Sequence, residues 1–126
     1  MTYEQILSDI KKRIYYPIYF LMGEEPFFID SISDELENTI LDEAERSFNQ
    51  VVIYGSDVDG VKDIITQARA FPMMGEYLVV IVKEAQNVKD IESLADYLDK
   101  LPSTTILIIN YKYKKLDKRR ALAKYV

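Results

Sequence analysis

Short apolar runs alternate along this chain with longer segments in which apolar residues recur every three or four positions. The short runs are apolar at nearly every residue and have the length of strands; they cover residues 18–22, 51–54, 78–82 and 105–109. Strands with two apolar faces must be covered on both, which is typical of parallel sheets. The sequence therefore predicts an α/β fold in which a parallel sheet has helices on both faces.

The segments between these runs have the apolar period of helices. The expected helices run from Tyr3 to Ile14, from Pro26 to about Glu45, from Asp57 or Asp59 to a point before Pro72, from Asp90 to Leu101, and onwards from Leu116 or Asp117. The apolar stripe of the longest helix consists of Phe28, Ile32, Leu36, Ile40 and Ala44. Because no linker or repeat interrupts the pattern, one domain is expected over residues 1–126, as a fragment of a longer polypeptide.

Composition removes several classes of chemistry. The 126 residues include no Cys and no His, which excludes disulfides, thiolate catalysis and the commonest general base and metal ligand. No apolar run approaches the roughly 20 residues of a membrane span, and no signal peptide is recognisable at the start. We expect a cytoplasmic protein with no membrane contact.

Charge is distributed unevenly along the chain. Nine acidic residues and no basic one lie between Glu24 and Glu45, whereas seven basic residues and a single Asp lie between Lys112 and Lys124. Solvated helix faces are the simpler explanation of both runs. Contact of the basic run with DNA or with an acidic partner subunit is the alternative.

Two strand ends occupy the positions at which a nucleotide-hydrolysing protein keeps its machinery. The first is followed by Gly23, Glu24, Glu25 and Pro26, without the Lys-Ser/Thr pair of a phosphate-binding loop. Carboxylates at a helix N-terminus repel a phosphate, and proline removes one N–H donor. The alternative interpretation is an ordinary strand-to-helix turn with acidic caps.

The second strand end carries Lys83 and Glu84 where an Asp-Glu pair would hold magnesium. An ammonium group has no lone pair to offer a metal, so Lys83 is expected to form a local ion pair or to be solvated. We expect no metal, no cofactor and no small-molecule substrate. A nucleotide-binding architecture without its chemistry favours a protein that works by contact.

The loop before the third strand, residues 70–77, is unusually apolar and is called the apolar loop below. It contains Phe71, Pro72, Met73 and Met74. A stiff aromatic-proline pair with adaptable methionines suits insertion into a partner's apolar pocket. The alternative is that Phe71 and one Met cover a helix end as part of the core. Exposure of Phe71 distinguishes the two.

The order of these segments resembles the N-terminal AAA+-like domain of the bacterial DNA polymerase III delta subunit, a clamp loader subunit. The resemblance rests on the combination of residues 23–29, 71–76, 78–85 and 114–119. It implies a truncated AAA+ core that has lost ATP binding and grips the ring-shaped sliding clamp, the beta subunit, in DNA replication.

The same resemblance implies particular roles. The family's hydrophobic pair, which enters the clamp pocket, falls on Phe71 and Pro72, with Met73 and Met74 flanking it, while the adjoining helix presses on the ring interface. Proline departs from the usual large apolar residue, so either Met is a second candidate. The domain is expected to be non-catalytic within a DNA-directed DNA polymerase holoenzyme, a nucleotidyltransferase. Other clamp loader subunits would bind through C-terminal domains that this chain lacks.

In the AAA+ strand order, the first strand of this chain would lie at a sheet edge, which predicts marginal stability or dimerisation. Two other functions compete with a clamp loader subunit. An ATPase with an atypical phosphate loop predicts stabilisation by nucleotide. A receiver-like regulatory domain requires an Asp at the end of the third strand, where this chain has Lys83.

Overall fold

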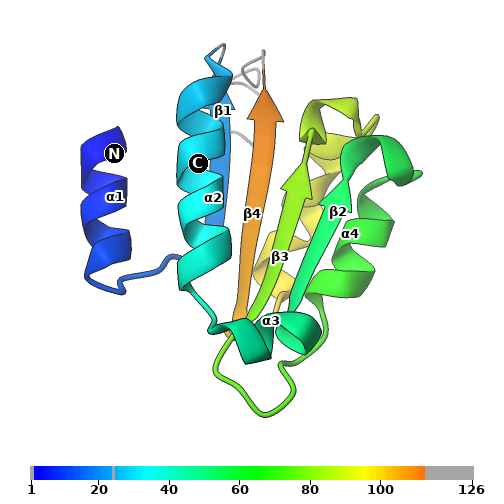
Figure 1. The fold of residues 1–126 in the computed structure, drawn as a ribbon. Coiled ribbons are helices and arrows are strands. Elements are labelled where there is room, and N and C mark those ends of the chain that lie inside the picture. Colours follow the sequence, from blue (N-terminus) through cyan, green and yellow to red (C-terminus); the bar gives the residue numbers. More distant parts are fainter. Residues whose placement is uncertain (1, 24, 113–126) are drawn as a thin grey trace.

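The structure is a computed structural model that describes residues 2–23 and 25–112. These residues form a four-stranded sheet of β1 (Ile18–Gly23), β2 (Gln50–Tyr54), β3 (Leu78–Lys83) and β4 (Thr105–Lys112). The strand order is β1-β4-β3-β2, and every neighbouring pair is parallel (Figure 1). Leu107, for example, lies between Ile18 and Val80. The predicted α/β fold with a parallel sheet is confirmed.

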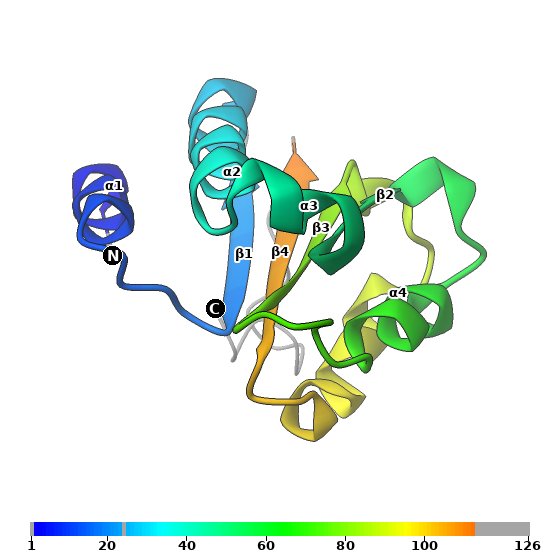
Figure 2. The same ribbon diagram turned by 60° about the horizontal axis from the view of Figure 1, so that its bottom comes forward.

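Alternate residues of the central strands point to two separate apolar cores. Val79 and Ile81 pack under α1 (Tyr3–Lys11) and α2 (Pro26–Thr39). On the other face, Val80 and Val82 pack under α4 (Val61–Ala68). Two short 3₁₀ segments, η3 (Ile91–Asp96) and η4 (Leu98–Lys100), complete that second layer. Figure 2 shows the helices on opposite sides of the sheet, as the two-faced apolar strands predicted.

The expected long helix from Pro26 to Glu45 is wrong, because the segment folds as two helices. After α2 ends at Thr39, α3 (Glu43–Asn49) begins with Asp42 as its N-cap, whose Oδ1 accepts a hydrogen bond from the Glu45 N–H at 2.9 Å. Carbonyl groups at the end of α2 bind guanidinium groups instead of continuing the helix: Arg13 contacts the Thr39 and Ile40 oxygens, and Arg46 the Asn38 and Leu41 oxygens. Ala44, expected on the buried stripe, is exposed as a result.

Smaller departures also have local causes. The first helix ends at Lys11 rather than Ile14, because Arg13 adopts a left-handed backbone with φ 59°. The segment expected to be one helix from Asp90 to Leu101 forms η3 and η4. Two further 3₁₀ segments are η1 (Gly55–Asp57), between β2 and α4, and η2 (Ala85–Asn87), between β3 and η3. The helix expected from Leu116 or Asp117 lies outside the described residues.

The N-terminus of α4 is stabilised by a residue from another element. The expected caps were Asp57 or Asp59, but Gly60 is the N-cap and offers no side chain. Instead, Asp90 Oδ1 accepts a hydrogen bond from the Val61 N–H at 3.0 Å. One carboxylate therefore joins α4 to the turn before η3.

Strand β1 lies at one edge of the described sheet, as expected, and β2 lies at the other. Pairing of the exposed edge with a second copy stays a prediction. Among the described residues, no helix has the length and apolar character needed to cross a membrane.

Replacing Asp90 with Ala removes the acceptor at the start of α4 and is expected to lower the free energy of unfolding by about 1 kcal/mol. Urea denaturation followed by circular dichroism measures the change. Asp57→Ala is the matched control, because Asp57 does not cap this helix. A larger loss for Asp57→Ala than for Asp90→Ala would show that the cap has been assigned to the wrong carboxylate.

Candidate protein-binding loop and the two strand ends

The apolar loop projects from the amino-terminal edge of the sheet, between α4 and β3, and lies beside α3 (Figure 1). Its large side chains face solvent: Phe71 is 72% exposed, Met73 64% and Met74 100%. Pro72 is half-buried. Phe71 and the two methionines therefore do not form part of the core, and the alternative in which they cover a helix end is wrong.

The backbone of the loop is nonetheless held in place by α3. Asn49, the last residue of α3, is fully buried. Its side-chain Oδ1 accepts a hydrogen bond from the Met73 N–H at 2.7 Å, and its Nδ2 donates one to the Met73 carbonyl at 3.0 Å. A single amide thus satisfies both polar groups of one loop residue.

A second close approach follows two residues later. A Cβ atom added to Gly75 would lie 2.7 Å from Glu45 Oε2 and 2.9 Å from Asn49 Nδ2, so no larger residue fits without displacement. Between the two contacts, Met74 has a left-handed backbone with φ 60°. The loop therefore presents solvent-exposed side chains from a backbone anchored on α3.

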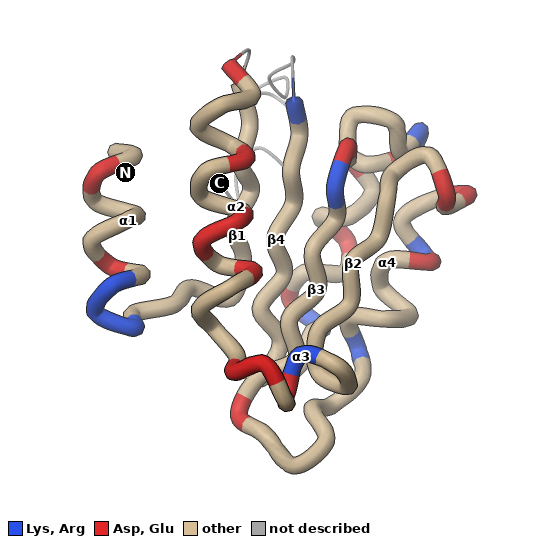
Figure 3. The backbone as a smooth tube through the Cα atoms, viewed as in Figure 1, with Lys and Arg blue, Asp and Glu red and all other residues tan. Residues whose placement is uncertain are grey.

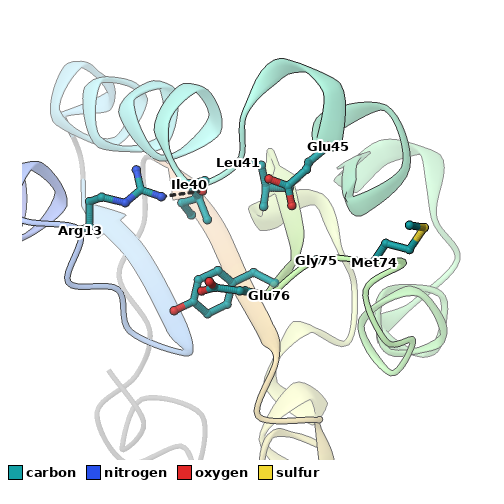
Figure 4. Close-up of a pocket in the computed structure, with 8 residues that line it drawn as sticks. Arg13, Ile40, Leu41, Glu45, Met74, Gly75 and Glu76 are labelled. Carbon is teal, nitrogen blue, oxygen red and sulfur yellow. Dashed lines mark hydrogen bonds between the residues drawn. The ribbon is translucent and has the colours of Figure 1, made fainter.

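An open groove of about 600 Å³ adjoins the loop. Figure 4 shows Arg13 at one end of this groove and Met74 at the other. The groove is lined by Arg13, Ile40, Leu41, Glu45, Met74, Gly75, Glu76 and Tyr77. Because the Arg13 guanidinium binds the carbonyl groups at the end of α2, it supports the wall of the groove.

The first strand end has the geometry of a strand-to-helix turn. Gly23 has φ 146°, a conformation that side chains rarely allow. Glu25 is the N-cap of α2 and accepts a long hydrogen bond, 3.5 Å, from the Phe27 N–H, while Pro26 occupies the first turn. Glu24 lies outside the described residues. The Glu25 carboxylate thus lies where a phosphate would have to bind.

At the second strand end, lysine side chains bind carboxylates of neighbouring elements. Lys83 Nζ lies 3.2 Å from Glu37 Oε1 of α2, so the expected local ion pair is formed with α2 rather than with the adjacent Glu84. Lys112, at the end of β4, lies 2.7 Å from Asp30 and 3.7 Å from Glu84. Figure 3 shows basic positions at the ends of β3 and β4 and acidic positions along α2, and the ion pairs connect the two.

These ion pairs occupy the carboxyl edge of the sheet, where open α/β sheets bind their ligands. The Lys112 side chain is only 13% exposed, and its backbone N–H donates to Gln86 Oε1 at 3.1 Å. Among the described residues, no group of three or more Asp or Glu side chains is arranged to hold a metal ion. The edge is therefore filled by the protein's own cations.

Sequence reasoning missed the residues that support both regions. Asn49 was not singled out, because nothing in its neighbouring sequence indicates that it binds a loop residue 24 positions away. Lys112 was assigned to the basic run, but it belongs to the ion pairs with Asp30 and Glu84. The remainder of that run, up to Lys124, lies outside the described residues.

Together, the β1-β4-β3-β2 sheet, the glycine turn before α2 and the strand ends without nucleotide chemistry define an AAA+-like α/β domain. The family model for the DNA polymerase III delta subunit matches residues 19–126. The chain belongs to the DNA polymerase III delta subunit family.

A curated protein from Bacillus subtilis (strain 168) and a solved structure from Bacillus subtilis agree with this assignment. DNA polymerase III subunit delta is 27% identical over 129 residues, which cover 94% of this chain and 37% of that protein. The solved structure of the DNA clamp loader delta protein matches with a TM-score of 0.82 and 26% identity, over 98% of this chain and 39% of that one. The chain thus spans somewhat more than a third of the length of these relatives.

Addition of ATP with magnesium is expected to leave the unfolding temperature unchanged, because Glu25 and the lysine ion pairs occupy the positions of phosphate and metal. A nucleotide that binds the folded state raises stability by RT ln(1 + [L]/Kd). Differential scanning fluorimetry over a series of ATP concentrations measures the shift. A rise that saturates with ATP would instead support the ATPase alternative.

Proposed function

We propose that this chain is the part of a clamp loader delta subunit that binds the sliding clamp, the beta subunit, and helps to open the ring for loading onto DNA. The matched model shows the family, and it supports the proposed role in replication. The single observation that carries the clamp contact is the apolar loop, in which Phe71 and Met74 face solvent on a backbone anchored by Asn49.

Energetics support a protein pocket as the target of this loop. Burial of a Phe or Met side chain contributes about 1.5–3 kcal/mol each. A few buried aromatic or apolar anchors carry most of the binding energy in protein interfaces. Phe71 and Met74 are therefore the proposed anchors. Pro72 is half-buried, so it is proposed to stiffen the loop rather than to fill the pocket.

Ring opening is assigned to the elements next to the loop. The contacts of Asn49 and Glu45 connect the loop backbone directly to α3. A partner pocket that receives Phe71 would thus bring α3 and the end of α4 against the clamp surface. Pressure from these helices on the ring interface is the proposed source of opening.

The domain is proposed to contribute no ATP hydrolysis and to need no cofactor. Glu25 at the N-cap of α2 disfavours phosphate, and Lys83 and Lys112 occupy the edge where a metal-bound nucleotide would lie. Catalysis in the DNA polymerase holoenzyme would then reside in other subunits.

Further partners are proposed from the length of the relatives and from the charge of the chain. Other clamp loader subunits would bind through the part of the delta relatives that this chain does not span. Contact with DNA through the basic run stays a hypothesis about residues beyond Lys112, because Lys112 itself is bound to Asp30 and Glu84.

The clamp contact predicts that Phe71→Ala and Met74→Ala each weaken binding to the sliding clamp from the same source by about 2 kcal/mol, or roughly 30-fold in Kd. Surface plasmon resonance with immobilised clamp measures the change. Phe27→Ala is the matched control, because Phe27 is 59% exposed but lies on α2 at the opposite edge of the sheet.

Wild-type affinity in both loop variants would remove the proposed contact. An equal loss in Phe27→Ala would move the interface to the carboxyl edge of the sheet. Circular dichroism spectra of the variants show whether each is folded before binding is compared.

A further inference from the structure

A buried polar side chain that is distant in sequence from the solvent-exposed loop residues binds their backbone directly. Among the described residues, the buried polar side chains are Ser33, Asn49, Thr105 and Asn110. Asn49 uses both ends of its amide on Met73, which lies 24 positions further along the chain. Burial of an amide is unfavourable unless its hydrogen bonds are made, so these two bonds are strongly favoured over an open loop.

The neighbouring contacts restrict the same short segment. A Cβ atom added to Gly75 would lie within 3 Å of the Glu45 and Asn49 side chains. Met74, between Met73 and Gly75, has φ 60°. The backbone is therefore fixed on both sides of the fully exposed Met74 side chain.

We propose that Asn49 is a positioning residue for clamp binding, which orders the apolar loop before the clamp arrives. This inference rests on the proposed function. A loop that is already ordered loses less conformational freedom on binding, and this increases affinity without any added contact. Asn49 does not need to touch the clamp: it acts through the Met73 backbone.

Asn49→Leu removes both hydrogen bonds while it keeps a side chain of similar size. It is expected to raise the Kd for the sliding clamp about tenfold, mainly through faster dissociation. Asn110→Leu is the matched control, since Asn110 is also buried and donates to Ser33 Oγ at 2.9 Å. It lies near the carboxyl end of β4, away from the apolar loop. The control is expected to reduce stability but to leave Kd unchanged.

Hydrogen exchange tests the ordering in the absence of the clamp. The Met73 amide hydrogen donates to Asn49 and is expected to exchange slowly in the wild type and in Asn110→Leu. In Asn49→Leu it is expected to exchange at the rate of an open loop, while the amides of β3 remain protected. Fast exchange of the Met73 amide in the wild type would overturn the inference.

Asn49→Asp provides a conservative variant and a second test if Asn49→Leu does not fold. An ionised Asp can accept from the Met73 N–H but repels the Met73 carbonyl, whereas a protonated Asp can donate to that carbonyl. The ratio of its Kd to that of the wild type is therefore expected to decrease as the pH is lowered, because burial and the nearby Glu45 carboxylate both raise the pKa of an introduced Asp.

The outcomes separate the two proposals. If Asn49→Leu binds like the wild type while Phe71→Ala and Met74→Ala bind weakly, the positioning role is overturned and the proposed function stands. Equal losses in Asn49→Leu and Asn110→Leu would also overturn it, because general destabilisation would explain both. If the loop variants bind like the wild type, the proposed function fails. A selective loss in Asn49→Leu, together with fast Met73 exchange, supports the inference.

Discussion

Parallel pairing of strands that are apolar on both faces determines where everything else in this domain can lie. Each strand must be followed by a crossover that covers a face of the sheet, and α2, α4 and the 3₁₀ segments do so. All strand amino ends then meet at one edge and all carboxyl ends at the other. The apolar loop therefore lies at the amino edge of the sheet, and the ion pairs of Lys83 and Lys112 lie at the carboxyl edge. The sequence at one edge can change without direct contact with the other.

At the carboxyl edge, two of the four carboxylates on α2 are paired with lysines of the chain itself. Lys83 and Lys112 extend from β3 and β4 to Glu37 and Asp30, and they bind the strands to the helix above them. In an active nucleotide site, a metal ion and a phosphate-binding lysine would carry the positive charge of this region. Here the side chains of the strands provide it, which explains how the architecture persists without the chemistry for which such edges are used.

The elements that depend on short apolar runs could be predicted from the sequence. The strands, their parallel pairing and the two-sided cover follow from uninterrupted apolar runs such as residues 78–82, and the structure confirms them. The break after α2 was missed because the helical period concealed the local contacts of Asp42 and Arg46, and because Arg13 binds carbonyl groups 26 and 27 positions away. The cap of α4 was misassigned for the same reason, since Asp90 acts from 29 positions away. Long-range side-chain contacts leave no periodic signal.

The candidate site likewise contains residues that the sequence revealed and contacts that it did not. Its apolar residues were recognisable because four of them follow one another in a loop, yet their exposure depends on how the loop lies against α3. Lys83 was expected either to form a local ion pair or to be solvated, and its actual partner, Glu37 on α2, could not be identified from neighbours in sequence. Asn49 required the three-dimensional contact with Met73, which no spacing rule predicts.

The internal ion pairs of Lys83 and Lys112 have a further consequence for how this edge responds to its surroundings. An ammonium group that is part of the chain cannot dissociate from it, whereas a bound metal ion can be removed by a chelator. The positive charge at this edge is therefore permanent in the folded chain and does not vary with the supply of ions in solution.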